Sequence, residues 1–71
     1  MHINHIKMTY DNNACQLSIF GMRSLFTVTA IDSEGTQICE ERLTGDFDQS
    51  MITEAIALAA FRAGVELAKE S

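Results

Sequence analysis

The fold is decided by residues 48–69, which read DQSMITEAIALAAFRAGVELAK. This stretch is rich in Ala, contains no Pro and has a single Gly, which is typical of a long helix. We predict a helix over about residues 48–69. Two arrangements could cap its N-terminus: Asp46 with Gln49 three residues later, or Ser50 with Glu54 in the first turn.

At 100° per residue, this helix carries two apolar stripes. The first stripe consists of Ile52, Ile56, Ala59, Ala63 and Leu67, with Ala60 beside it. The second, which we call the outward stripe, lies roughly opposite and contains Met51, Leu58, Phe61, Val65 and Ala68. A single sheet covers only one stripe of a helix, so the outward stripe must face water or meet other residues.

We interpret the outward stripe as an interaction surface, with Met51, Leu58, Phe61 and Val65 as its expected contact residues. A symmetric homodimer is the commonest form of such an interface, and a larger protein partner is the alternative. Two intramolecular explanations stay open. The first strand or the loop at Met22 could cover the stripe, or the helix could break near Gly64.

Before the helix, apolar and polar residues mostly alternate up to about Leu43, which is the period of β-strands. We predict four strands, at about residues 3–10, 14–20, 25–32 and 36–43. Short connections make an antiparallel meander, and its apolar face needs a cover that the helix supplies. The expected fold is α+β, with the order ββββα, in one domain over residues 1–71.

The first hairpin is predicted to turn at Asn12-Asn13, because Asn tolerates positive φ better than most residues. This turn pairs apolar residues on one face: Tyr10 with Cys15, Met8 with Leu17, and Ile6 with Ile19. The other face then carries polar residues and one aromatic: Lys7, Thr9, Gln16 and Ser18, with His5 opposite Phe20.

The second hairpin is predicted to turn at Glu34-Gly35, which pairs Ala30 with Cys39, Val28 with Glu41, and Phe26 with Leu43. The residues expected on the outer face are Thr27, Thr29, Ile31, Ile38, Glu40 and Arg42. Glu41 is a charged residue that this pairing places on the apolar face. It either lies at the sheet edge beyond the helix, or a bulge at Gly35 shifts the register.

Charge is unevenly distributed along the 71 residues, whose net charge is −5. Residues 1–31 carry +1, whereas residues 32–54 hold seven acids against Arg42 and carry −6. This excess of acidic over basic residues does not suit a basic nucleic-acid-binding surface, so direct nucleic-acid binding is not expected. The acids either form an ordinary solvated surface or make a docking face, with Glu34, Glu40, Asp46, Asp48 and Glu54 as its candidates.

No catalytic constellation is apparent. The four Gly residues are isolated, and His2 and His5 point to opposite faces of a strand, so they cannot share a metal there. Cys15 and Cys39 lack zinc or redox spacing, and we predict buried thiols, with a disulfide as the alternative. We therefore expect no enzymatic activity, catalytic residue, metal or cofactor.

The sequence shows neither the pattern of a signal peptide nor an apolar run long enough to span a bilayer, so we expect a cytoplasmic location. The favoured hypothesis for function is a small non-enzymatic protein-interaction domain that dimerises or docks through its C-terminal helix. The alternative is an acidic inhibitor or nucleic-acid mimic of bacterial or phage origin, which blocks a basic site on a larger macromolecule.

Overall fold

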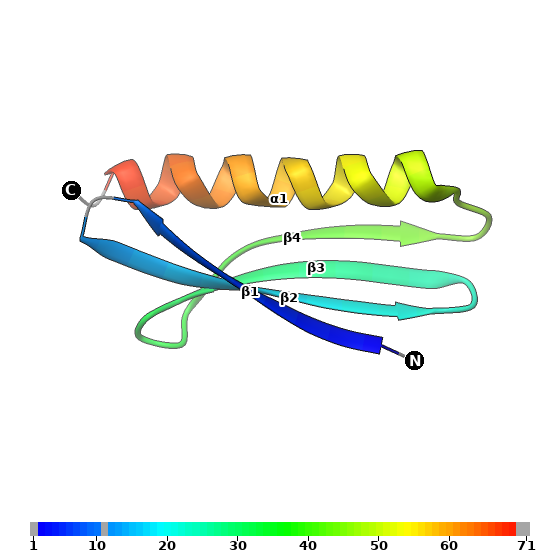
Figure 1. The fold of residues 1–71 in the computed structure, drawn as a ribbon, viewed down its shortest axis with the longest axis horizontal. Coiled ribbons are helices and arrows are strands. Elements are labelled where there is room, and N and C mark those ends of the chain that lie inside the picture. The colour runs from blue at the N-terminus through cyan, green and yellow to red at the C-terminus, as the bar shows by residue number, and fades with distance from the viewer. Residues whose placement is uncertain (1, 11, 70–71) are drawn as a thin grey trace.

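Four antiparallel strands form one open sheet, and a helix lies across one of its faces (Figure 1). This computed structural model describes residues 2–10 and 12–69. Its elements are β1 (His2–Tyr10), β2 (Asn13–Met22), β3 (Leu25–Asp32), β4 (Gln37–Thr44) and α1 (Gln49–Lys69). The strands lie in the order β1-β2-β3-β4, so the predicted ββββα meander is confirmed.

The pairing of β1 with β2 differs from the predicted register by two residues. Tyr10 lies opposite Asn13, Met8 opposite Cys15, and Ile6 opposite Leu17, while His5 faces Ser18 rather than Phe20. The residues between the strands are therefore 11 and 12, not 12 and 13, and position 11 lies outside the described residues. Because side chains alternate with a period of two, this offset leaves each of them on its predicted face.

Asn13 is a strand residue, and its amide gives a physical reason for the observed register. Its Nδ2 donates a hydrogen bond to the backbone carbonyl of Leu67, at 3.1 Å. This bond ties the start of β2 to the last turns of α1. Asp and Asn both suit two-residue turns, so the local sequence allowed either position of the loop.

The pairing of β3 with β4 is as predicted at Phe26–Leu43, Val28–Glu41 and Ala30–Cys39. The register then shifts, because Ile31 pairs with Gln37 and leaves Ile38 as an extra residue on β4. Ile38 was expected on the outer face, and this expectation is wrong. The bulge turns it toward α1, where it packs half-buried against the core.

The loop between β3 and β4 spans residues 33–36 and is longer than the predicted two-residue turn. The Oδ1 atom of Asp32 accepts hydrogen bonds from the backbone N–H groups of Glu34 and Thr36, both at 2.9 Å. Gly35 has a φ of 85°, which residues with a side chain rarely adopt. The predicted bulge is therefore present in this hairpin, but next to Ala30 rather than at Gly35.

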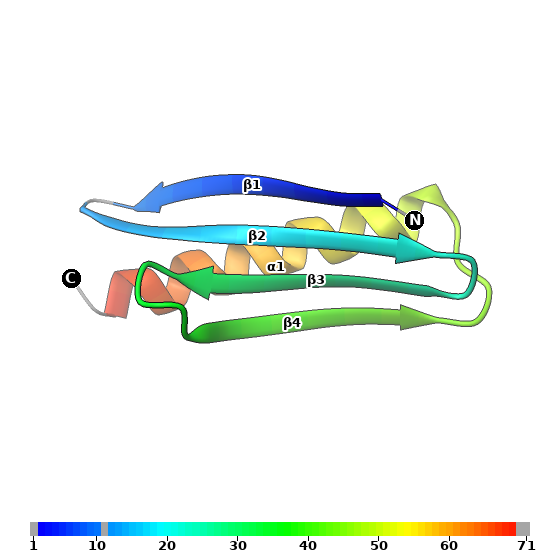
Figure 2. The same cartoon turned by 90° about the horizontal axis from the view of Figure 1, so that it is seen from below.

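The core lies between the sheet and α1, and the helix approaches the sheet through small side chains. Ala55, Ala59 and Ala63 are buried along α1, and the Sγ of Cys39 donates to the carbonyl of Ala59 at 3.6 Å. The helix crosses the sheet obliquely (Figure 2) and packs mainly on β4 and β3, with β1 touched least. The buried residues are Cys15, Leu17, Ile19, Phe26, Val28, Ala30, Ala55, Ala59, Ala63 and Leu67.

The N-terminus of α1 is capped by Asp48, so both predicted capping arrangements are wrong. The Oδ1 of Asp48 accepts hydrogen bonds from the backbone N–H of Met51, at 2.9 Å, and from the hydroxyl of Ser50, at 2.8 Å. These bonds favour the carboxylate and hold the pKa of Asp48 below its ordinary value. An Asp immediately before the first helical residue is a preferred cap.

Replacing Asp48 with Ala is expected to lower the midpoint of thermal unfolding at pH 7. A carboxyl group whose pKa is depressed on folding stabilises the fold above its unfolded pKa of about 3.9. That contribution is lost as the pH falls through the lower folded value. The difference in midpoint between Asp48→Ala and wild type should therefore shrink below about pH 4. Asp46→Ala removes an exposed neighbouring acid and serves as the control; an equal effect from it would contradict the cap.

Candidate interaction surface

The four expected contact residues of the outward stripe all lie exposed on α1. Phe61 is the most exposed, at 68%, and Met51, Leu58 and Val65 are each at least 40% exposed. The helix continues without a break through Gly64, and Met22 is itself exposed. Since the four residues stay exposed, neither the first strand nor the loop at Met22 covers the outward stripe, and the helix does not break. The role of the stripe in binding stays a prediction.

A second apolar region adjoins the outward stripe on the side of β1. Ile6 is 42% exposed and Tyr10 is 48% exposed, although both point to the face of the sheet that carries α1. An open depression connects Tyr10 to the helix. Its uncharged lining is formed by Tyr10, Ala60, Phe61, Gly64, Val65 and Ala68. We call this region the β1 flank.

The sequence placed Ile6 and Tyr10 on the apolar face but did not show that the helix leaves them uncovered. A helix is about 10 Å wide, whereas the outer axes of four strands lie about 14 Å apart. One helix therefore cannot cover all four strands. Because α1 packs mainly on β4 and β3, β1 is the strand that it covers least.

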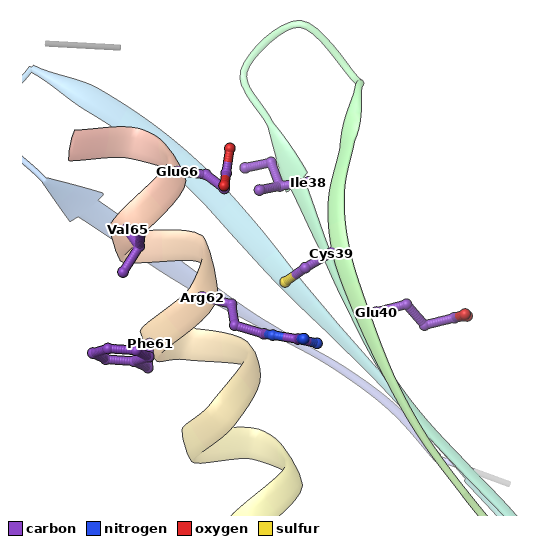
Figure 3. A pocket seen from close by; sticks show the side chains of 7 residues that line it. All are labelled: Ile38, Cys39, Glu40, Phe61, Arg62, Val65 and Glu66. Atoms are coloured by element: carbon purple, nitrogen blue, oxygen red, sulfur yellow. The ribbon is translucent and has the colours of Figure 1, made fainter. Parts of the chain in front are cut away.

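The opposite side of α1, toward β4, is charged. Figure 3 shows Arg62 extending from the helix toward β4, while Phe61 lies on the side of the helix away from that strand. Arg62 forms an ion pair with Glu41, whose side chain is only 19% exposed. Glu41 thus lies at the sheet edge, which was one of its two predicted explanations, and its charge is matched there.

The depression between α1 and β4 has a mixed lining. It is formed by Ile38, Cys39, Glu40, Phe61, Arg62, Val65 and Glu66 (Figure 3). Arg62 is already paired with Glu41, and Lys69 reaches Glu66 at 3.2 Å. The two sides of α1 therefore differ: ion pairs occupy the β4 side, and uncharged residues line the β1 flank.

The five acids proposed as a docking face are all exposed, but they do not gather in one place. Glu34 lies in the loop between β3 and β4, whereas Asp46 and Asp48 precede α1 at the other end of the molecule (Figure 1). Glu40 lies between these ends on β4, and Glu54 lies on α1. The structure thus spreads the five acids from one end of the molecule to the other, over β4, two loops and α1.

Neither cysteine forms a disulfide, and burial raises the pKa of both thiols. Cys15 is buried, as predicted, whereas Cys39, which was also predicted to be buried, is half-buried. His5 lies on the outer face, where its Nδ1 is 2.9 Å from the Nε2 of Gln16 and 3.2 Å from the Oγ of Ser18. Cys15 points to the other face, so these groups form no Cys–His pair. Within residues 2–10 and 12–69, no three His, Cys, Asp or Glu side chains are grouped to hold a metal.

No protein-family model matches the chain, and the comparisons with curated proteins and with solved structures found no match. In the part of the chain that the structure describes, no helix has the length and apolar character needed to cross a membrane. Function is therefore inferred from the exposed surfaces of the molecule.

Proposed function

We propose that this chain is a protein-interaction domain that forms a symmetric dimer through the outward stripe of α1. The observation that carries the proposal is the 68% exposure of Phe61 between Leu58 and Val65, which are also exposed. Full burial of a side chain of this size contributes about 1.5–3 kcal/mol. A contiguous group of such side chains on a small domain is typical of a site that another protein surface covers.

The charges beside the stripe support a second copy of the chain as the partner. Glu54 and Arg62 lie four residues before and four residues after Leu58, about one helical turn from it in each direction and on either side of it around the helix axis. If two α1 helices cross antiparallel with Leu58 on the two-fold axis, Glu54 of each copy meets Arg62 of the other. The side chain of Arg62 is 58% exposed while it pairs with Glu41, so it remains accessible to a second carboxylate.

Phe61→Glu tests the dimer. Charge buried in an apolar interface is costly, so we expect this variant to halve the particle mass measured by sedimentation equilibrium at micromolar concentration. Its thermal unfolding at high dilution should match that of wild type, because Phe61 lies outside the core. Thr44→Glu adds the same charge at an exposed position on β4 and should leave the mass unchanged. Wild type with the 7.9 kDa mass of one chain would contradict the proposal.

A charge exchange tests the antiparallel geometry. Glu54→Arg and Arg62→Glu should each weaken the dimer, whereas the double variant should recover most of the affinity, because the opposed pair is restored with reversed signs. The symmetric interface holds two such ion pairs, each contributing about 0.2–1 kcal/mol, and a single variant removes both. Each single variant should therefore raise the dissociation constant by about twofold to thirtyfold. Failure of the double variant to recover would contradict this geometry and leave the contact at Phe61 standing.

The acidic inhibitor remains a second proposal, supported by the exposure of all five acids. Because Asp48 is the helix cap, charge reversal there would also disturb the fold. Glu34→Lys with Glu40→Lys changes the docking face without touching the cap. Capture of a basic macromolecule that weakens with salt and is lost in this double variant would support the inhibitor; unchanged capture would contradict it.

A further inference from the structure

The two edges of the sheet are built differently. β4 carries a bulge at Ile38, the charged residues Glu40, Glu41 and Arg42, and an ion pair to α1. Bulges and charges are devices that keep an edge strand from pairing with another chain. In contrast, β1 runs for nine residues in uninterrupted register, from His2 opposite Gly21 to Tyr10 opposite Asn13.

The β1 edge is open and almost uncharged. Figure 2 shows β1 at the border of the sheet, with no described element beyond it. The strand has no Pro, and Lys7 is its single Lys, Arg, Asp or Glu. A regular edge strand of this length presents backbone N–H and C=O groups that an added strand can bind.

We propose that β1 pairs antiparallel with β1 of a second copy, joining two sheets into one of eight strands. This pairing goes beyond the contact through α1 and uses a separate surface. Ile6 lies at the centre of β1 and is 42% exposed on the helix-bearing face. With the two-fold axis at Ile6, the two Ile6 side chains meet, and Asn4 of each copy faces Met8 of the other.

Charge favours a second copy as the occupant of this edge. Each chain has a net charge of −5, but residues 32–54 alone carry −6 and belong to the β3–β4 half and the start of α1. Pairing through β1 therefore places the acids of the β3–β4 hairpin, Asp32, Glu34, Glu40 and Glu41, on the half of each sheet away from the new contact. An axis at Lys7 would instead bring two like charges together, which disfavours that register.

The pairing also fixes where the helices lie. A two-fold axis between antiparallel strands of one sheet is perpendicular to that sheet, so both α1 helices lie on the same face. The β1 flanks of the two copies, each lined by Tyr10 and Phe61, then lie on this same face, near opposite ends of the paired β1 strands. The outward stripes remain uncovered by this pairing and free to make the contact through α1.

Variants in the Phe61→Glu background separate the two interfaces. Wild type with both interfaces formed holds four copies. With the α1 contact removed by Phe61→Glu, we expect sedimentation equilibrium to show two copies per particle, which is the halved mass predicted above and is held together by β1. Adding Ile6→Lys should give one copy, because inward-pointing charges on edge strands oppose pairing. Met22→Lys adds the same charge at another exposed apolar position and should leave two copies. A folded single-copy Phe61→Glu protein overturns the β1 pairing and leaves the α1 dimer standing. A single-copy Ile6→Lys protein with Phe61 intact overturns the α1 dimer instead.

Hydrogen exchange on Phe61→Glu tests the pairing without a change in β1. In a lone edge strand, alternate amides point to solvent and exchange quickly. In the paired strand, these amides should be slowed on the order of tenfold or more at high protein concentration. Dilution should restore fast exchange. Fast exchange at alternate β1 amides in a two-copy particle would overturn the pairing, because another surface would then join the copies.

Discussion

Replacing Ala59 with Phe is expected to unfold the domain or to remove most of its stability. Ala59 is fully buried, and its carbonyl oxygen lies 3.6 Å from the Sγ of Cys39 on β4. An added ring has no room between helix and sheet unless α1 moves away. Overpacking costs about 1–3 kcal/mol, and more where the backbone cannot shift. A domain of this length has roughly 4–11 kcal/mol of stability in total.

Ala57→Phe is the matched control for this change. Ala57 lies two residues away on α1 and is exposed, so the same substitution there adds the same volume and the same change in helix propensity outside the core. Urea unfolding followed by circular dichroism gives the free energy of unfolding of both variants. We expect Ala57→Phe to fall within about 1 kcal/mol of wild type. Equal stability of the two variants would contradict close packing of α1 through Ala59.

The spacing of apolar residues along the sequence predicted the order of strands and helix, because the two kinds of element place apolar residues at different spacings. The alternation of apolar and polar residues could not determine the register of β1 against β2. A shift of two residues leaves Met8 and Cys15 on the same face, and residues 11–13 offer more than one suitable turn. The decisive contact, from Asn13 to the carbonyl of Leu67, joins residues 54 positions apart. Local patterns do not contain such information.

The sequence contains one feature that is consistent with the bulge at Ile38, but the prediction from simple alternation did not use it. Ile38 and Cys39 are consecutive apolar residues in a strand, and both point toward the helix side in the structure. Ala55 was also missed, because small side chains contribute little to an apolar stripe although this one is buried. Its burial follows from how closely α1 approaches the sheet, which is a property of the packed molecule.

The exposed stripe was predictable from helical spacing, whereas the β1 flank was not. The stripe depends only on which residues of α1 face away from the sheet. Exposure of Ile6 and Tyr10 depends on the lateral position of α1, which packs mainly on β4 and β3. Close contact at Ala59 and the ion pair between Arg62 and Glu41 favour that position. Each of these contacts joins the helix to β4.

Leu67→Ala should have the second large effect on stability. Leu67 is 1% exposed and is the single large side chain of α1 among the most fully buried ones, which also include Leu17 and Val28. Elsewhere the fully buried positions of α1 are Ala, so this Leu supplies much of the apolar contact of the last helical turns. Truncation of a buried Leu to Ala costs about 2–5 kcal/mol, through lost contacts and the cavity that remains.

The Leu67→Ala variant should lose stability locally, at the end of α1, as well as in global unfolding. Without the Leu67 side chain, the last turns of α1 should pack less tightly on the sheet. The hydrogen bond from Asn13 to the carbonyl of residue 67 should then open more often. Amide exchange near the C-terminus of α1 should therefore accelerate more than exchange near Ala55. Val65→Ala truncates an exposed side chain two residues away and should cost less than about 1 kcal/mol in the monomer. If both truncations cost the same in urea unfolding, the end of α1 is not anchored by Leu67, and the β1 flank beside it would not be a fixed surface.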